Sequence, residues 1–213
     1  MDNMMITLPL LILFLPLVSF IILIFFGKKL PRQGDWVAVG SIVATFFFAL
    51  YLFIQMILEY DPGFSHGASF SWIDLDAFKI DLGILVDNLT VIMLLIVTLV
   101  SSCTHIFSLK YMEGDIRYSR YFAYLGLFTF SMNGIVLADN LISMYMSWEL
   151  VGVSSYLLIG HWFEKDSAAD ASKKAFLTNR VGDIGFFIGI MLLYTAVGSF
   201  AFDSIFDSIA GGD

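Results

Sequence analysis

The chain has 213 residues, of which 59% are hydrophobic and only 14% are charged, and its mean hydropathy is +0.85. This is the composition of a membrane protein, so the formal charge of −8 says little about soluble partners. The single cysteine, Cys103, excludes a disulfide framework and a CxxC metal site, and the sequence has no glycine-rich nucleotide-binding loop. Any redox chemistry is therefore expected in other chains.

Six apolar runs are long enough to cross a bilayer as helices, which takes about twenty residues each. We expect these spans at residues 4–26, 36–60, 85–109, 119–137, 141–162 and 172–196. The first run is longer than the apolar part of a signal peptide and its basic residues follow it, so we expect it to be retained. The predicted fold class is an all-α integral membrane protein, with residues 1–196 as its membrane domain.

Two segments outside these spans have patterns of their own. Residues 70–82 alternate apolar and polar side chains over much of their length, which predicts a short β-hairpin that turns near Asp76. The tail, residues 197–213, contains the repeat FDSIFDSI. A spacing of four favours an interfacial amphipathic helix over a functional repeat.

The basic residues predict the orientation. Nine of the eleven lie in the loops after the first, third and fifth spans: Lys28, Lys29, Arg32, Lys110, Arg117, Arg120, Lys165, Lys173 and Lys174. Basic loops stay in the cytoplasm, so we expect both chain ends and the hairpin on the outer face of a bacterial plasma membrane.

Three ionisable residues lie within the predicted spans. Glu149 is about 12 Å along the fifth span from its outer end, and Asp183 is about 16 Å along the sixth from its cytoplasmic end, so both lie near the midplane. Arg180 is three residues before Asp183 and shares its helix face, and Lys173 continues this stripe toward the cytoplasm. A charge at mid-bilayer costs about 2.5 to 3.5 kcal/mol or more, so each must be paired, hydrated or functional.

Two interpretations of these charges remain open. Arg180 and Asp183 can form no more than an internally neutralised pair that lets the helix insert, or they can serve a proton site. Glu149 has no opposite charge within one turn of its own helix, so a purely structural role requires a partner on another helix. A functional role is favoured for it, because burial and nearby cations shift the proton affinity of a carboxylate in opposite directions.

Several further residues carry weaker expectations. The spacing of Gly185 and Gly189 predicts close packing of a second face of the sixth span. His105 is expected to make an interhelical hydrogen bond rather than to relay protons. Asp87, Asp139 and Asn140 stand at span ends, where they can cap helices or face water.

Two blocks of sequence together resemble those of a known protein family. SRYFAYLGLFTFSMNGIVLADNLISMYMSWELVGVSSYLLIGHWF, followed by KKAFLTNRVGDIGFF, closely resembles the antiporter-like L subunit of respiratory complex I, whose mitochondrial counterpart is NADH dehydrogenase subunit 5. The W-E-x-V-G block contains Glu149 and the N-R-V-G-D block contains Arg180 and Asp183. The resemblance implies that Glu149 carries protons with a lysine on a seventh helix, and that Arg180 and Asp183 support the same channel. We expect Lys173 to contribute to cytoplasmic access.

The same resemblance implies a proton-translocating subunit of NADH:quinone oxidoreductase. It implies FMN, iron–sulfur clusters and quinone in partner subunits, and contact with other membrane-arm subunits, especially a neighbouring antiporter-like one, with no nucleic acid. A subunit of a multisubunit cation/proton antiporter, a subunit of an ion-coupled inorganic-carbon uptake complex, and a non-pumping structural piece remain alternatives. The chain corresponds to only the first third of the family's length, without the seventh-helix lysine, so we expect that it does not pump protons alone.

Overall fold

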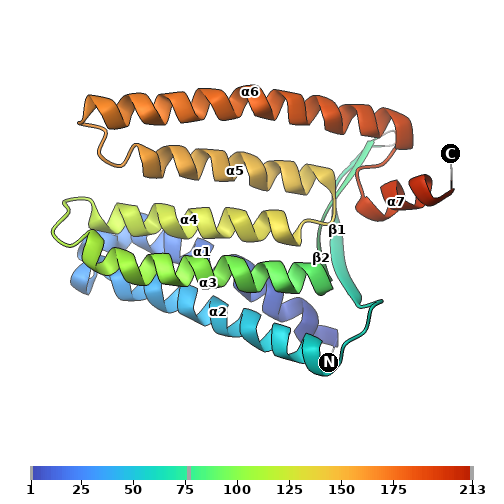
Figure 1. Cartoon of the computed structure of the whole chain (residues 1–213), viewed down its shortest axis with the longest axis horizontal. Coiled ribbons are helices and arrows are strands. Elements are labelled where there is room, and N and C mark those ends of the chain that lie inside the picture. Colours follow the sequence, from blue (N-terminus) through green and yellow to red (C-terminus); the bar gives the residue numbers. More distant parts are fainter. Residues whose placement is uncertain (1, 76–77, 212–213) are drawn as a thin grey trace.

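The computed structural model describes residues 2–75 and 78–211. Within these residues the chain forms six long helices, a two-stranded antiparallel hairpin and a short final helix (Figure 1). The long helices are α1 (Asp2–Phe26), α2 (Asp35–Leu58), α3 (Asn88–Tyr111), α4 (Tyr118–Leu137), α5 (Leu141–Ile159) and α6 (Asp166–Val197). Two 3₁₀ turns, η1 (Gly27–Lys29) and η2 (Pro31–Gly34), join α1 to α2, and β1 (Ser65–Leu75), β2 (Phe78–Asp87) and α7 (Phe202–Gly211) complete the chain.

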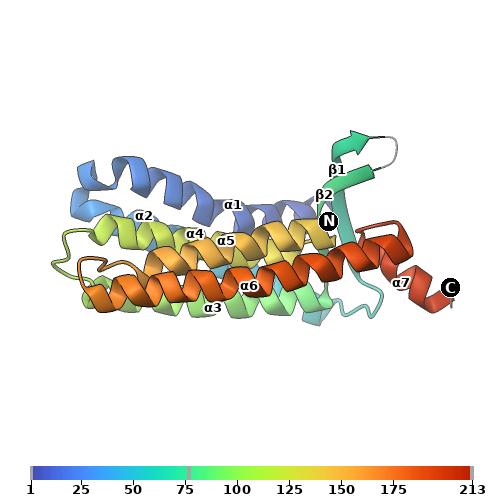
Figure 2. The ribbon, with the colours of Figure 1, turned by 90° about the horizontal axis from the view of Figure 1, so that it is seen from above.

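The helices form a four-helix bundle with two helices added in a row. Helix α4 packs on α1 and α3, and α2 closes the bundle against α1 and α3. Helix α5 packs on α4, and α6 packs on α5, so α6 lies at the edge farthest from α2 (Figures 1 and 2).

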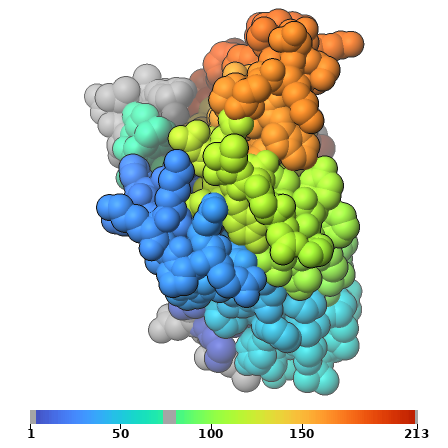
Figure 3. Space-filling model, turned by 90° about the vertical axis from the view of Figure 1, so that its left-hand side faces the viewer, coloured from blue at the N-terminus to red at the C-terminus, as the bar shows by residue number. Residues whose placement is uncertain are grey.

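The bundle has two chemically distinct ends. The connections 27–34, 112–117 and 160–165 meet at one end, which we call the basic end, and Figure 3 views the molecule from there. The hairpin, α7 and both chain termini lie toward the other end, which we call the hairpin end (Figure 1). The alternation that the basic residues predict is therefore confirmed.

The structure confirms a mostly helical fold with membrane-spanning helices and a hairpin. By length and composition, five helices of the described chain can cross a membrane, namely those that contain α1, α2, α3, α5 and α6. The predicted span at 119–137 forms α4 but falls outside that set. Its central position explains this, because several of its buried residues are polar: Ser119, Thr129, Ser131 and Asn133.

Several observed boundaries differ from the approximate predicted ones. The hairpin extends over 65–75 and 78–87 rather than 70–82, while its predicted turn near Asp76 lies outside the described residues. Residues 85–87 belong to β2, so α3 begins at Asn88, where the Asp87 carboxylate caps the helix by accepting from the Thr90 N–H at 2.7 Å. Helix α5 ends at Ile159, not 162, and α6 begins at Asp166, about two turns before residue 172.

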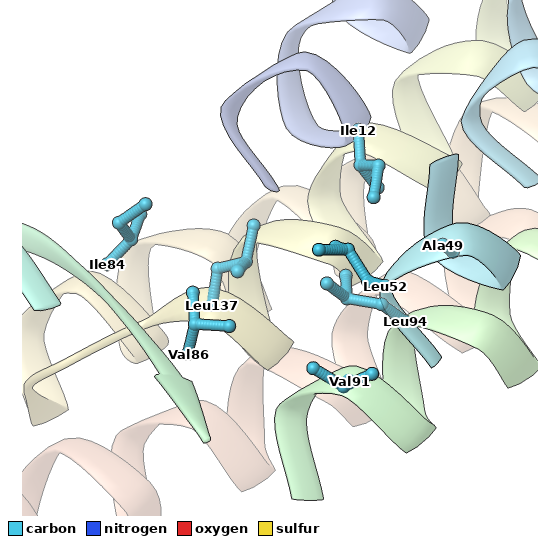
Figure 4. Close-up of a cluster of buried hydrophobic side chains, with 8 residues drawn as sticks. All are labelled: Ile12, Ala49, Leu52, Ile84, Val86, Val91, Leu94 and Leu137. Atoms are coloured by element: carbon cyan, nitrogen blue, oxygen red, sulfur yellow. The ribbon is translucent and has the colours of Figure 1, made fainter. Parts of the chain in front are cut away.

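One cluster of buried apolar residues fastens the hairpin to the bundle. It joins α1, α2, α3 and α4 to strand β2 at the hairpin end, as Figure 4 shows. Its members are Ile12, Ala49, Leu52, Ile84, Val86, Val91, Leu94 and Leu137. The sheet is thus part of the membrane bundle's core and not a free appendage.

A proline in α1 explains why this helix and α4 are tied together by a polar contact. Pro16 has no N–H, so the carbonyl of Ile12 loses its usual partner within the helix. The fully buried side chain of Asn133 donates to that carbonyl from α4, at 3.1 Å. Close approach at Gly126, where an added Cβ would lie 3.2 Å from the Pro16 carbonyl oxygen, makes this pairing possible.

The tail predicted as an amphipathic helix contains α7. Ile205 is buried against α5 and α6, in a cluster with Leu141, Ile190 and Phe200. Phe206 and Ile209 are exposed. That the tail lies at the membrane surface, and that it forms a unit separate from residues 1–196, stay predictions.

Candidate proton site

The central contact of the site joins α5 to α6. Glu149 lies in the middle of α5, and the Nη1 atom of Arg180 on α6 forms an ion pair with its Oε2 atom. The Glu149 side chain is 21% exposed and that of Arg180 is 36% exposed. The partner on another helix that the structural interpretation of Glu149 requires is therefore present, and it is a residue that the sequence had singled out.

Arg180 lies between two carboxylates. Its Nη1 atom is 3.9 Å from Oδ2 of Asp183, one turn farther along α6, so the contact within the helix is looser than the contact between helices. Its guanidinium carbon lies 4.9 Å from the centre of the Phe176 ring, which adds a cation–π contact. The simple picture of an Arg180–Asp183 pair that neutralises itself thus does not describe the arrangement.

Asp183 is held by a residue that the sequence analysis did not assign. Its carboxylate is buried, and its Oδ1 atom accepts a hydrogen bond from the indole Nε1–H of Trp148 at 3.0 Å. Trp148 is next to Glu149 on α5, so the two helices are joined twice at the same depth. An indole N–H in the middle of a span needs a hydrogen-bond acceptor, so the position of Trp148 was the sequence signal for this contact.

A cavity of about 460 Å³ adjoins the buried carboxylate. Its lining includes Asp183, Asn179, Gly152 and Trp148. Gly152 lacks a side chain, and Asn179 of α6 lies 3.9 Å from where its Cβ would be. The volume and polar groups suit water beside the Asp183 carboxylate.

Lys173 is not part of this contact. It lies seven residues before Arg180, about 10 Å along α6, and its side chain is 70% exposed. Its ammonium group lies 3.5 Å from the Asp170 carboxylate, and it lines a second cavity at the basic end. The structure therefore brings Glu149, Arg180 and Asp183 together and leaves Lys173 apart from them.

Other expectations meet mixed outcomes. His105 is fully buried, but its Nδ1 atom contacts the carbonyl of Ser101 in its own helix, at 2.9 Å, and its Nε2 atom has no partner among the described residues. The interhelical bond expected of His105 was therefore wrong, and Ser101 instead bonds across to Thr129 of α4 at 2.6 Å. Asn140 caps α5 as expected, by accepting from the Ser143 N–H at 2.8 Å.

The glycine face of α6 is open in this structure. Cβ atoms added at Gly182, Gly185 or Gly189 would meet nothing within 4 Å. The close packing expected there is absent from the described part of the chain. The same helix exposes apolar side chains such as Val181 and Ile184.

A cluster of polar residues at the basic end joins two loops. The Asp115 carboxylate accepts from the Trp162 Nε1–H at 2.8 Å and lies 3.3 Å from Nε2 of His161. Burial raises the pKa of Asp115, but hydrogen bonds from Trp162, the Arg117 backbone and His161 outweigh that effect, and the pKa lies below its ordinary value of 3.8. These contacts join the connection between α3 and α4 to the connection between α5 and α6.

Within the described residues no group of three or more His, Cys, Asp and Glu side chains could hold a metal ion. The ionisable residues that the structure brings together within the spans are Glu149, Arg180 and Asp183.

Comparison with protein families places most of the chain. Residues 72–122 match the family described as NADH-Ubiquinone oxidoreductase (complex I), chain 5 N-terminus. Residues 138–212 match the family described as NADH:quinone oxidoreductase/Mrp antiporter, TM.

Individual relatives agree with these matches. The chain is 43% identical, over 182 residues, to NAD(P)H-quinone oxidoreductase subunit 5, chloroplastic, of Draba nemorosa, and 53% identical over 134 residues to that of Chlorokybus atmophyticus. The first match covers 85% of this chain and 24% of the relative, and the second covers 63% and 20%. The chain thus spans about a quarter of the length of the relatives it matches.

A solved structure shares the fold. It is a chain of the membrane-bound sulfane sulfur reductase, an archaeal respiratory membrane complex, and it superposes with a TM-score of 0.75 at 18% identity. The superposition covers 92% of this chain and 39% of the other.

Proposed function

Because the chain belongs to the antiporter-like chain 5 family of respiratory complex I, as its N-terminal portion, we propose that it takes part in proton translocation driven by NAD(P)H:quinone oxidoreduction. The observation that carries the proposal is the ion pair between Glu149 and Arg180 in the middle of two adjacent spans. An ionisable pair at that depth is expensive to maintain in a bilayer unless it is functional.

The three charged groups can exchange a proton as follows. Glu149, Arg180 and Asp183 together carry one net negative charge when both carboxyls are ionised, so the group has room for one proton. When the guanidinium lies against Glu149 it favours the carboxylate form, and when it moves toward Asp183 it leaves Glu149 able to take up a proton. The distance of 3.9 Å between Arg180 Nη1 and Asp183 Oδ2 makes this a small movement.

Trp148 and the adjoining cavity support this exchange. The indole hydrogen bond fixes the Asp183 carboxylate, so the arginine has a stationary alternative partner. The cavity beside Asp183 provides space for water that can deliver or remove the proton. We propose that Lys173 contributes to proton access from the basic end, which lies in the cytoplasm if the membrane is bacterial.

The chain supplies no redox cofactor site under this proposal. FMN, iron–sulfur clusters and quinone belong to partner subunits, and other membrane-arm subunits, including an antiporter-like neighbour, are its binding partners. The translocase activity is that of the assembled complex.

The proposal is tested with Glu149→Gln in the full-length subunit within the assembled complex. NADH-driven proton uptake by membrane vesicles is measured together with NADH oxidation, and we expect proton uptake to fall at least tenfold. Glu59→Gln is the matched control, because Glu59 is exposed at the end of α2 and the chemical change is the same. Wild-type proton uptake and oxidation in Glu149→Gln would refute the role.

A multisubunit cation/proton antiporter is the second candidate. It is favoured by one observation, the match of residues 138–212 to a family that includes Mrp antiporters. The genes beside this one discriminate between the two: NADH-binding and iron–sulfur subunits accompany the first, and small antiporter subunits accompany the second.

A further inference from the structure

A second cavity lies at the basic end, away from the Glu149–Arg180 pair. It has a volume of about 360 Å³ and opens between the start of α4, the end of α5 and the start of α6. Figure 3 shows this end, where the α3–α4 segment (lime) lies against the α5–α6 segment (orange). Its lining includes three cations, Arg117, Arg120 and Lys173, and no carboxylate.

The three cations are not equally available to a ligand. Arg117 forms an ion pair with Glu164 and lies over the Phe163 ring at 4.5 Å, and Lys173 faces Asp170. Arg120, by contrast, is exposed and has no ion-pair or hydrogen-bond partner in the part of the chain that the structure describes. One guanidinium with five donors therefore remains free at the wall of the cavity.

The rest of the lining suits an amphiphilic ligand. Tyr124 and Tyr156 also line the cavity, and Leu157 and Phe163 bring apolar surface. The Ser172 hydroxyl donates to the Ala169 carbonyl at 2.9 Å, so it is not a free donor. Hydroxyl and guanidinium donors match the oxygens of a phosphodiester, and arginine binds phosphate with two parallel hydrogen bonds. A small hydrated anion would gain nothing from the apolar lining of the cavity, whereas the glycerol and upper acyl chain of a lipid can contact it.

The position in the fold agrees with this chemistry. The cavity lies where three helices end, at the level at which membrane-spanning helices reach the lipid headgroups. Basic pockets between helices on the cytoplasmic side of membrane proteins bind anionic headgroups. We infer that this cavity binds the phosphate headgroup of an anionic phospholipid, with Arg120 as its principal ligand.

A lipid bound there would connect the two regions of the fold. The cavity is bounded by Arg117, Arg120 and Tyr124 near the start of α4, and by Lys173 and Ser172 on α6. Its occupant would therefore join the four-helix bundle to α6, which within the described residues packs mainly on α5. The inference is independent of proton translocation, because none of its measurements depends on Glu149.

The test counts lipids that remain bound to the purified full chain. The protein is placed in nanodiscs of phosphatidylcholine with a minor share of phosphatidylglycerol, released, and examined by native mass spectrometry for retained phosphatidylglycerol. We expect Arg120→Gln to lower the apparent affinity for phosphatidylglycerol about fivefold, the effect of one cation at a membrane surface. Arg120→Lys keeps the charge but loses the two parallel hydrogen bonds, so it should retain only part of the affinity.

Lys174→Gln is the matched control, since it removes an exposed cation from the same end that does not line the cavity. It should change the affinity less than twofold. Equal losses in Arg120→Gln and Lys174→Gln would overturn the site, because they would reflect only the general charge of this end.

Two further measurements complete the test. Lys173→Gln removes a second lining cation that already faces Asp170, so it should lower the affinity less than Arg120→Gln does but more than Lys174→Gln does. The outcome therefore does not depend on the folding of one variant. Inorganic phosphate added to phosphatidylcholine nanodiscs should not raise the melting temperature of the wild-type chain. An Arg120-dependent rise would overturn the assignment to a lipid in favour of a free anion.

Discussion

The four-helix bundle of α1–α4 and the pair α5–α6 differ in the share of residues that is buried and in the partners of their polar side chains. In the most apolar stretch of α3, 33% of the residues are buried, whereas the figure is 6% for α5 and 11% for α6. Polar side chains in the bundle mostly satisfy their own helix, as when Thr98 donates to the carbonyl of Leu94 and Ser131 to that of Leu127. In the pair, the ionisable groups are satisfied by each other across the helices.

This difference teaches where movement is possible. A bundle closed by packed apolar side chains has one low-energy arrangement. A contact made by an arginine between two carboxylates has at least two, because the same cation can serve either partner. Within the described residues, the candidate proton site thus lies on helices with a smaller buried share than α3.

The largest expected effect is at the centre of the bundle. Phe122 is fully buried on α4, so Phe122→Ala should lower the free energy of unfolding by about 3 to 5 kcal/mol, through lost contacts and a residual cavity. Denaturant unfolding of the reconstituted chain measures it. Phe25→Ala, at a side chain that is 73% exposed, should have little effect, and equal losses would contradict the comparison.

A second pair of variants tests how closely neighbouring helices pack at two glycines. Gly126→Leu should destabilise the chain by about 1 to 3 kcal/mol, because α1 must move away from α4. Gly185→Leu, on the open face of α6, should be tolerated. A large loss of stability at Gly185 in the same unfolding assay would show that α6 is packed as tightly as α4.

The ion pair of the second region is tested by a double-mutant cycle. Glu149→Gln, Arg180→Gln and the double variant should give a coupling energy of about 1 to 2 kcal/mol, because the pair is only partly exposed. Lys110 and Glu113, an exposed pair at the end of α3, should show a smaller coupling, because solvent screens it. Equal coupling energies in the two cycles would show that the Glu149–Arg180 pair is no stronger than an exposed pair.

The smallest expected effect concerns the loops that link the two regions. The pKa of Asp115 is lower in the folded chain, so its carboxylate contributes stability that is fully present above about pH 3.8 and is lost as the pH falls through the lower folded value. We expect a loss of about 1 kcal/mol below pH 3.8 that Asp115→Asn does not show. Parallel stability curves for wild type and Asp115→Asn between pH 7 and 3 would contradict this.

Asp139, a half-buried acid at the hairpin end, shows the opposite pKa shift. Burial raises the pKa of Asp139, in spite of the hydrogen bond that it accepts from Asn140. Its folded form therefore favours the protonated carboxyl, and its contribution to stability declines as the pH rises above about 3.8. The two ends of the bundle thus respond oppositely to acid.

The sequence predicted the features that depend on one helix at a time. The number and order of the long helices and the basic end follow from hydropathy and charge, and the functional roles of Glu149, Arg180 and Asp183 stay predictions. The helix caps at Asp87 and Asn140 could be predicted in the same way, because each hydrogen bond joins residues three positions apart.

Features that depend on two elements could not be predicted in the same way. The hydrogen bond from Trp148 to Asp183 and the ion pair from Arg180 to Glu149 require the register of α5 against α6, which no single periodicity contains. The bond from Asn133 to the carbonyl of Ile12 requires both the gap left by Pro16 and its position against α4. His105 was misjudged for the same reason, since its partner on its own helix was not distinguished from one on a neighbour.

The Glu149–Arg180 contact also bears on how the chain enters the membrane during synthesis. Helix α5 alone would carry the uncompensated charge of Glu149 into the hydrocarbon, at about 2.5 to 3.5 kcal/mol, whereas α6 alone pairs Arg180 with Asp183 only through the looser contact at 3.9 Å. Because the opposite charges lie on consecutive helices, the ribosome delivers them within one helical hairpin, and their mutual neutralisation lowers the barrier to the partition of that hairpin from the translocon into lipid. The site that we propose for proton transfer is thus also a device for biogenesis, and substitutions there should be examined for insertion before they are examined for activity.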